Sequence, residues 1–260
     1  MRIPCDYIRV YIAETDALDD PAVYDRLYQM LPDFRRKKAD SYKVVGARNQ
    51  SVAAFCLLMY GLEKVLIPDD PESDYDIWNT LDYQTTETGK PYFTGRPDIH
   101  FSLSHTKGAV MCAISGSEVG CDIERIDRRM DLESVAARIL TEEEFSACRV
   151  EPSDNQPAVN DIVTDINKDQ QDGQVNRIQP LPGIDPKEFF RIWTRKEAYS
   201  KYTGLGLKQI ADRFDLEKAD AHIVSGETST HIWSVASEFV KLSPKEANII
   251  SIDTFLPKHG

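Results

Sequence analysis

Two acidic residues with a spacing suited to metal binding lie in the stretch SEVGCDIERID, residues 117–127. The stretch is apolar enough to form a strand, and side chains alternate along a strand, so Asp122 and Glu124 point to the same face. Neighbouring carboxylates repel each other, and their burial without a partner is costly. Either this is an edge strand with solvated acids, or the two carboxylates share a cation.

A third acid lies on the most strongly patterned helix of the chain, which we expect over 186–203 because a proline begins it and glycines follow it. Glu197 and Lys201 are four residues apart and share one face of this helix. If the helix crosses the edge of the strand, Glu197 joins Asp122 and Glu124, and the three carboxylates form the kind of oxygen site that Mg²⁺ prefers. The alternative is a surface ion pair between Glu197 and Lys201.

Basic and hydroxyl-bearing residues elsewhere are candidates for phosphate binding. Five Lys and Arg residues lie within 35–43, which indicates either a solvated helix face or an anion site. Lys90 lies between a glycine and a proline, in a turn that could aim its ammonium at a phosphate. Ser104 and His105 end a strand-like segment, where such a pair is more often structural than catalytic. The sequence has no glycine-rich phosphate loop, so side chains must form any phosphate site.

The elements that must position these residues follow from periodicity. We expect strands over 6–14, 79–85, 100–106, 109–115, 118–126, 231–237 and 248–255. We expect helices over 20–31, 45–65, 132–140 and 186–203, and one that starts with a capping box from Thr141 to Glu144. The lack of a regular βαβ rhythm predicts an α+β fold. Residues 150–186 are rich in Asp, Asn, Gln and Pro, which predicts a long flexible insertion.

Composition restricts the compartment and the partners. The chain has 260 residues and a net charge of −12, which argues against a general nucleic-acid binder. No apolar run reaches the length of a membrane span, and the N-terminus has no apolar signal core. Five cysteines without a CxxC spacing fit reduced thiols. We therefore expect a cytoplasmic protein that binds neither nucleic acid nor membrane.

Taken together, four motifs resemble those of one enzyme family. VGCDIERI, followed by FFRIWTRKEAYSKYTGLGL, resembles the paired signature of the 4′-phosphopantetheinyl transferases, G-x-D-x-E and then W-x-x-K-E-A-x-x-K. GKPYF and HFSLSHT resemble the two earlier motifs of the surfactin synthetase-activating (Sfp-type) branch, in the expected order. The resemblance covers about residues 31–207, apart from a loop at 68–82 and the insertion at 150–186.

This resemblance implies a pseudo-dimer of two similar halves, residues 1–115 and 116–260, with coenzyme A and Mg²⁺ in the cleft between them. It implies that Asp122, Glu124 and Glu197 bind the metal. The contacts to coenzyme A that it implies are Arg35, Lys38, Ser51, Lys90, Pro91, Ser104, His105 and Lys201.

The implied reaction transfers phosphopantetheine from coenzyme A to a serine of an apo acyl or peptidyl carrier protein and releases adenosine 3′,5′-bisphosphate. The resemblance makes Glu197 the candidate base, directly or through a metal-bound water, and Lys201 a source of fixed positive charge. We expect a monomer.

Two alternatives stay open. One is a non-catalytic protein on the same fold that binds coenzyme A or a carrier protein. The other is an unrelated magnesium-dependent phosphohydrolase, although the five histidines show no spacing typical of a His–Asp metal cluster. The sequence does not identify the carrier protein.

Overall fold

The structure is a computed structural model that describes residues 2–66, 81–150, 183–206, 213–239 and 242–255. Most of the predicted insertion at 150–186 and of the loop at 68–82 lies outside these residues. The described strands form three sheets, and together with the helices they confirm the predicted α+β class.

The largest sheet has the strand order β4-β5-β1-β9. Its strands are β1 (Ile8–Glu14), β4 (His100–Thr106), β5 (Ala109–Ser115) and β9 (Ala247–Ile250). A three-stranded sheet has the order β6-β8-β7, formed by β6 (Val119–Arg125), β7 (His222–Glu227) and β8 (His231–Ser237). A separate hairpin pairs β2 (Asp82–Thr85) with β3 (Pro91–Thr94).

The two larger sheets share one topology. In the first, β1 is followed by the long helix α3 (Val45–Leu66) and the hairpin β4–β5, and β5 pairs with both β1 and β4. In the second, β6 is followed, after helices α4 and α5, by helix α6 (Pro186–Thr203) and the hairpin β7–β8, and β8 pairs with both β6 and β7. The predicted division at residue 115 falls between β5 and β6, whereas β9 lies in the first sheet, parallel to β1.

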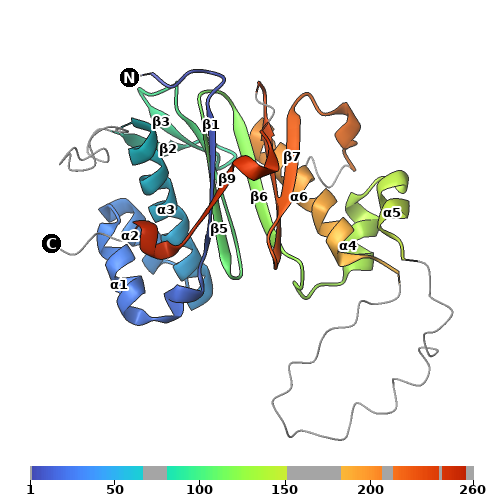
Figure 1. The fold of residues 1–260 in the computed structure, drawn as a ribbon, viewed down its shortest axis with the longest axis horizontal. Helices are drawn as coiled ribbons and strands as arrows, with labels where there is room; N and C mark the ends of the chain where they lie inside the picture. The colour runs from blue at the N-terminus through green and yellow to red at the C-terminus, as the bar shows by residue number, and fades with distance from the viewer. Residues whose placement is uncertain (1, 67–80, 151–182, 207–212, 240–241, 256–260) are drawn as a thin grey trace, which may run out of the picture.

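The sheets lie between two groups of helices. Figure 1 shows α3 with α1 (Pro21–Met30) and α2 (Asp33–Asp40) on one side of the sheets, and α6 with α4 (Leu132–Ile139) and α5 (Glu142–Cys148) on the other. Tyr11 and Cys112 belong to the core on the α3 side, whereas Val10 and Met111 pack against the second sheet. The alternation of side chains along β1 and β5 thus supplies two cores at once.

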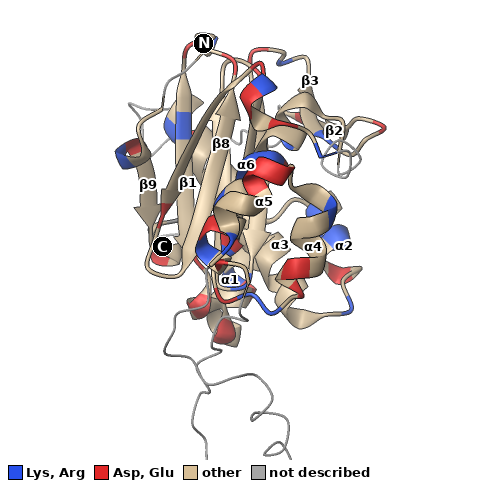
Figure 2. Ribbon diagram, turned by 90° about the vertical axis from the view of Figure 1, so that its right-hand side faces the viewer, with Lys and Arg blue, Asp and Glu red and all other residues tan. Residues whose placement is uncertain are grey.

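The helix ends lie at the capping residues that the sequence indicates. Asp185 caps α6 by accepting a hydrogen bond from the Lys187 backbone, and Gly204 ends the helix in the left-handed conformation at φ 72°. The capping box between Thr141 and Glu144 is confirmed at the start of α5. Figure 2 looks onto the side of the molecule that carries α4, α5 and α6, where acidic and basic segments lie next to each other.

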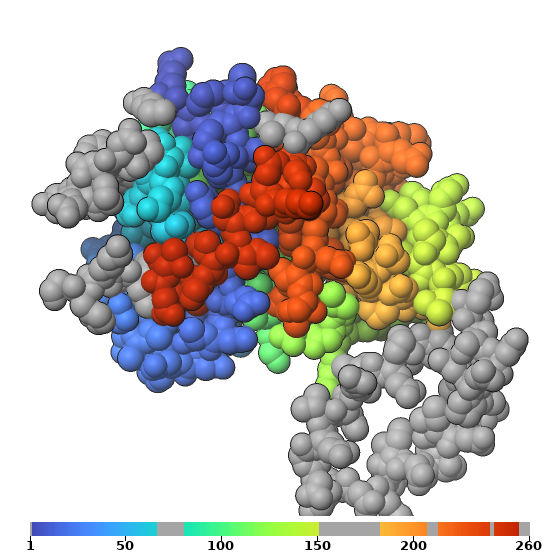
Figure 3. All heavy atoms as spheres, viewed as in Figure 1, coloured from blue at the N-terminus to red at the C-terminus, as the bar shows by residue number. Residues whose placement is uncertain are grey.

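Some sequence predictions were incomplete. The short strands β3 and β7 were not predicted, and Ile252–Phe255 forms a 3-10 helix rather than the end of a strand. The chain leaves the sheet after β9 because Ser251 accepts a hydrogen bond from the Asp253 backbone and Ile252 turns into the core. Figure 3 shows residues 242–255, in red, running across this face from the orange C-terminal segments to the blue N-terminal part of the chain. None of the described helices combines the length and the apolar character needed to cross a membrane.

Candidate active site

A glycine lets α6 lie directly on β6. A Cβ atom at Gly120 would stand 2.0 Å from the carbonyl oxygen of Ala198 and 2.3 Å from the backbone nitrogen of Tyr202. Both distances are far inside van der Waals contact, so any larger residue would push the helix off the strand. The close approach brings the face of α6 that carries Glu197 and Lys201 over the acids of β6.

Hydroxyl groups join the neighbouring edges of the two sheets at β4 and β6. The backbone nitrogen of Cys121 donates to the Ser102 hydroxyl at 3.0 Å, and that of Ile123 donates to the Ser104 hydroxyl at 3.3 Å. Side chains of β4 therefore take the place of a backbone ladder along this seam.

The same stripe of hydroxyls contacts the two acids. The hydroxyl of Ser104 donates to Oδ1 of Asp122 at 2.7 Å, and that of Thr106 donates to Oε2 of Glu124 at 3.0 Å. Both acids are buried, with 5% and 8% exposure respectively. Solvated acids on an open edge strand, the simpler alternative, are therefore excluded.

Asp122 has one satisfied and one unsatisfied oxygen. Its Oδ1 also accepts a hydrogen bond from the ammonium of Lys201 at 2.8 Å. Its Oδ2 is buried and has no hydrogen-bond partner in the described part of the chain. Burial lowers the pKa of Lys201, but the charge of Asp122, the hydrogen bond to it and the charges of Cys121 and Glu197 together outweigh burial and raise this pKa above its ordinary value.

The surroundings of the other two acids, Glu124 and Glu197, disfavour their charged forms. Burial and then the charge of Asp122 raise the pKa of Glu124, even though Arg128 forms an ion pair with it. No hydrogen bond or ion pair joins Glu197 to a described residue, so the alternative of a surface ion pair with Lys201 is not formed. Burial, followed by the charge of Asp122, raises the pKa of Glu197 to about 7.

The three acids fit a divalent cation by their chemistry. Among the described residues no group of three His, Cys, Asp or Glu side chains is already drawn together around a metal position. The set nevertheless offers only hard oxygen donors, includes the unsatisfied Oδ2 of Asp122, and carries surplus negative charge, as the raised pKa values of Glu124 and Glu197 record. The role of these acids in binding Mg²⁺ stays a prediction.

A cavity of about 460 Å³ opens beside these acids, within the range of ligand pockets. Glu197 lines it, and so do six of the eight residues predicted to contact coenzyme A. These six are Arg35, Ser51, Lys90, Pro91, His105 and Lys201. Aromatic rings of Tyr42, Tyr83 and Phe101 also line it.

The two remaining residues lie elsewhere. Ser104 points away from His105 along β4 and contacts Asp122, so in this structure it positions an acid. The ammonium of Lys38 lies 5.5 Å from the centre of the Tyr42 ring, behind a residue that lines the cavity.

Arg35 is a half-buried cation without an acidic partner among the described residues. Its guanidinium donates to the Ser51 hydroxyl at 3.2 Å and lies over the Phe55 ring at 4.5 Å from its centre. Its Nε is buried without a hydrogen-bond partner, and no described carboxylate forms an ion pair with it. Burial lowers its pKa. A half-buried guanidinium that lacks a carboxylate partner and lines a cavity wall is a site for an anion.

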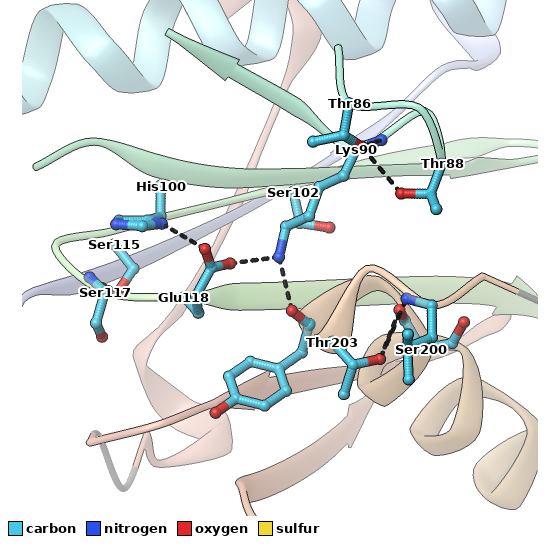
Figure 4. Close-up of polar contacts among 12 residues, drawn as sticks. Thr86, Thr88, Lys90, His100, Ser102, Ser115, Ser117, Glu118, Ser200 and Thr203 are labelled. Atoms are coloured by element: carbon cyan, nitrogen blue, oxygen red, sulfur yellow. Dashed lines mark hydrogen bonds and ion pairs between the residues drawn. The ribbon is translucent and has the colours of Figure 1, made fainter. Parts of the chain in front are cut away.

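Lys90 and His105 differ in their charge. Lys90 follows Gly89, whose φ of 88° forms the predicted turn, and its ammonium contacts Glu118 and the carbonyl oxygen of Tyr202 at 2.7 Å (Figure 4). Burial and then the charge of Lys201 lower the pKa of His105, so its imidazole is neutral at pH 7 and offers a hydrogen bond instead of a charge.

Four residues that contact the strand acids or Lys90 were not predicted: Thr106, Glu118, Arg128 and Tyr202. The first two had a signal in the sequence. Ser102, Ser104 and Thr106 alternate along one strand as Asp122 and Glu124 do along the next, and Glu118 has the same parity as both acids.

Comparison with known proteins points to one family. Residues 118–246 match the family model of the 4′-phosphopantetheinyl transferase superfamily. The matched region includes Asp122, Glu124, Glu197 and Lys201 but none of the lining residues contributed by α2, α3 and the β2–β3 hairpin.

Individual relatives agree. The chain is 26% identical over 144 residues to a 4′-phosphopantetheinyl transferase of Bacillus subtilis, which covers 55% of this chain and 50% of the relative. It is 28% identical over 134 residues to the 4′-phosphopantetheinyl transferase Sfp of Bacillus subtilis strain 168. This alignment covers 52% of this chain and 46% of the relative. It is 30% identical over 142 residues to the 4′-phosphopantetheinyl transferase gsp of Aneurinibacillus migulanus, covering 55% and 46%. The chain thus spans about half the length of the curated relatives it matches.

Proposed function

Because the chain belongs to the 4′-phosphopantetheinyl transferase superfamily, we propose that it transfers the phosphopantetheine group of coenzyme A to a serine of an apo acyl or peptidyl carrier protein. One observation carries the proposal. The cavity that Glu197 and Lys201 line on α6 is also lined by the unpaired Arg35 and by Lys90. Cations around a cavity that borders three acids suit a ligand with several phosphates.

The cations bind and orient the phosphates. Arg35 supplies a charge that no described acid neutralises, while Lys90 and Lys201 supply ammonium groups from two other walls. His105 adds a hydrogen bond. Ser51 and Pro91 shape the neighbouring walls, and Lys38 reaches the nucleotide from outside the Tyr42 ring.

The acids supply the second part of the site. Asp122, Glu124 and Glu197 would hold Mg²⁺, which when bound neutralises charge on the pyrophosphate during transfer. Lys201 holds Oδ1 of Asp122 through the contact at 2.8 Å. Ser104 and Thr106 hold the two strand acids in place from β4.

Proton transfer falls to Glu197. The serine oxygen of the carrier forms a bond to the phosphorus next to the pantetheine arm, and the bond from that phosphorus to the departing adenosine 3′,5′-bisphosphate breaks. The serine proton must leave, and Glu197, a carboxylate at the cavity wall without a cationic partner among the described residues, accepts it directly or through a water molecule.

Three further parts of the proposal concern the whole protein. The shared topology of β1–α3–β4–β5 and β6–α6–β7–β8 supports a fused pseudo-dimer that acts as a monomer. All five cysteines are free, which supports the cytoplasm as its location. The net charge of −12 supports a protein partner over nucleic acid.

Intact-mass spectrometry tests the proposal. Several apo carrier proteins are incubated with coenzyme A, Mg²⁺ and this protein, with and without EDTA. A metal-dependent gain of one phosphopantetheine supports transfer, and the carriers that respond define its range. If coenzyme A binds but no carrier gains mass, the protein is a non-catalytic binder; if coenzyme A does not bind either, the proposal fails.

A further inference from the structure

Lys90 is held from two directions by acceptors of the second sheet and its helix. One is Glu118, which immediately precedes β6, and the other is the carbonyl oxygen of Tyr202 in the last turn of α6, at 2.7 Å. The end of a helix carries partial negative charge, which favours a cation there. The Lys90 side chain is 20% exposed, so these contacts fix a largely buried ammonium. We call Glu118, Lys90 and the Tyr202 carbonyl the clasp.

Glu118 is itself held in place. Figure 4 shows it between His100 and Lys90, with Oε1 at 3.2 Å from Nδ1 of His100. The hydrogen bond from His100 and then that from Lys90 outweigh partial burial and lower the pKa of Glu118 to about 2. Glu118 is therefore a permanent anion at neutral pH. It does not line the cavity.

The backbone of Lys90 is fixed as firmly as its side chain. Its nitrogen donates to the Thr86 hydroxyl at 3.0 Å, and that hydroxyl lies 2.9 Å from the Thr88 hydroxyl (Figure 4). Among the described strands, β2 and β3 pair only with each other, so the clasp ties this wall of the cavity to β6 and α6.

We propose that Glu118 is a positioning residue, which acts through Lys90 by fixing its ammonium between the hairpin and the end of α6 before an anion enters the cavity. An ammonium has three N–H donors, and the clasp uses two of them. The third is left for the ligand, and its direction is set in advance, which lowers the entropy lost on binding. The nature of the anion, a phosphate of coenzyme A, rests on the proposed function; the clasp itself does not.

Coenzyme A binding by calorimetry, together with steady-state kinetics on a responsive carrier, tests this role. Glu118→Ala should weaken coenzyme A binding and raise its KM about tenfold while kcat changes less than about twofold. Glu118→Gln keeps an oxygen that accepts from Lys90, so its loss should be about threefold. Glu87→Ala removes an acid from the exposed turn of the same hairpin and serves as the control, with no change expected.

The Lys90→Met background separates action through Lys90 from any other effect. There, Glu118→Ala should have no further effect on coenzyme A binding. Additive losses of coenzyme A affinity in the double variant would overturn the proposal. Tighter binding in Glu118→Ala would also overturn it, because Glu118 would then be a counter-ion that competes with phosphate for Lys90.

Amide hydrogen exchange provides a readout that needs no coenzyme A. Exchange over residues 82–94 should accelerate in Glu118→Ala, accelerate at least as much in Lys90→Met, which loses both contacts of the clasp, and stay unchanged in Glu87→Ala. If the wild-type protein binds no coenzyme A, the proposed function fails. Amide exchange then remains as the test of whether Glu118 restrains the hairpin through Lys90. Unchanged exchange in Glu118→Ala would refute this restraint.

Discussion

The ammonium of Lys201 lies 2.8 Å from Oδ1 of Asp122, on a different element, and not beside Glu197, four residues earlier on its own helix. Helical spacing alone allows the pair within α6. Lys201 pairs with Asp122 instead, because the close packing of α6 on β6 turns the Lys201 side chain toward this buried acid. Glu197 is consequently left without a cationic partner among the described residues, and its pKa is raised to about 7.

Replacing Lys201 by methionine should cost more stability than replacing a lysine at the surface. The variant leaves Asp122 buried and unpaired, so we expect a loss of about 2 kcal/mol at pH 7.5 in urea unfolding. Turnover should fall about 100-fold. Lys187→Met is the matched control: Lys187 and its partner Glu227 are each 45% exposed, so its loss should be under about 0.5 kcal/mol. Equal losses in the two variants would contradict the buried pair.

Glu197 should make the protein less stable as pH rises. Its pKa is about 7 in the folded state and near the ordinary 4.5 when unfolded, so folding takes up a proton between these values. The favourable contribution is complete below about pH 4.5 and is lost as pH rises through 7, on the order of 2 kcal/mol in all.

Thermal unfolding in metal-free buffer measures this effect. Glu197→Gln should match the wild-type Tm near pH 4.5 and exceed it at pH 8. Glu188→Gln, on the same helix, should follow the wild type at both pH values. A Glu197→Gln variant with no advantage at pH 8 would show that this carboxyl is not destabilised.

Gly120→Ala should separate α6 from β6. The added Cβ would meet backbone atoms of Ala198 and Tyr202, which cannot move independently of the helix. We expect a loss of at least about 3 kcal/mol and no measurable transfer. Gly46→Ala, where a Cβ meets nothing within 4 Å in a helix, should instead be neutral or stabilising by about 0.5 kcal/mol. A well-folded, active Gly120→Ala variant would refute the account of this glycine.

Magnesium should stabilise the protein through the three acids. At pH 8, millimolar MgCl₂ should raise the wild-type Tm by several degrees, because a ligand that binds only the folded state stabilises it. Asp122→Asn, which keeps the shape but removes charge, should lose most of the shift. NaCl at matched ionic strength controls for charge screening. The same shift in wild type and variant would place the metal elsewhere.

Regular periodicity explains how much of the fold was predictable. The helices at 45–66 and 186–203 and the strands at 8–14, 100–106 and 109–115 bury long, uninterrupted patterns, so the sequence places them within a few residues. The strands β3 and β7 were missed because one is four residues long and begins with Pro91, and the other is only half-buried and contains Gly226.

The site was predictable in its parts but not in its pairings. Period-two alternation put Asp122 and Glu124 on one face, and the structure brings Glu197 and Lys201 to the same place. The partner of Lys201 depends on how α6 is rotated on the sheet, and the contact of Lys90 with Glu118 depends on where a separate hairpin lies. Neither follows from spacing along the chain.

A single-turnover experiment tests whether Glu197 is required for phosphopantetheine transfer. Carrier mass and released nucleotide are measured together for wild type, Glu197→Gln and Glu188→Gln, with an apo carrier and with the same carrier lacking its serine hydroxyl. With wild type and Glu188→Gln, we expect the apo carrier to gain one phosphopantetheine for each adenosine 3′,5′-bisphosphate released. With Glu197→Gln, or with the carrier that lacks the serine hydroxyl, we expect neither product. Full turnover by Glu197→Gln, or nucleotide release without a gain in carrier mass, would contradict this role of Glu197.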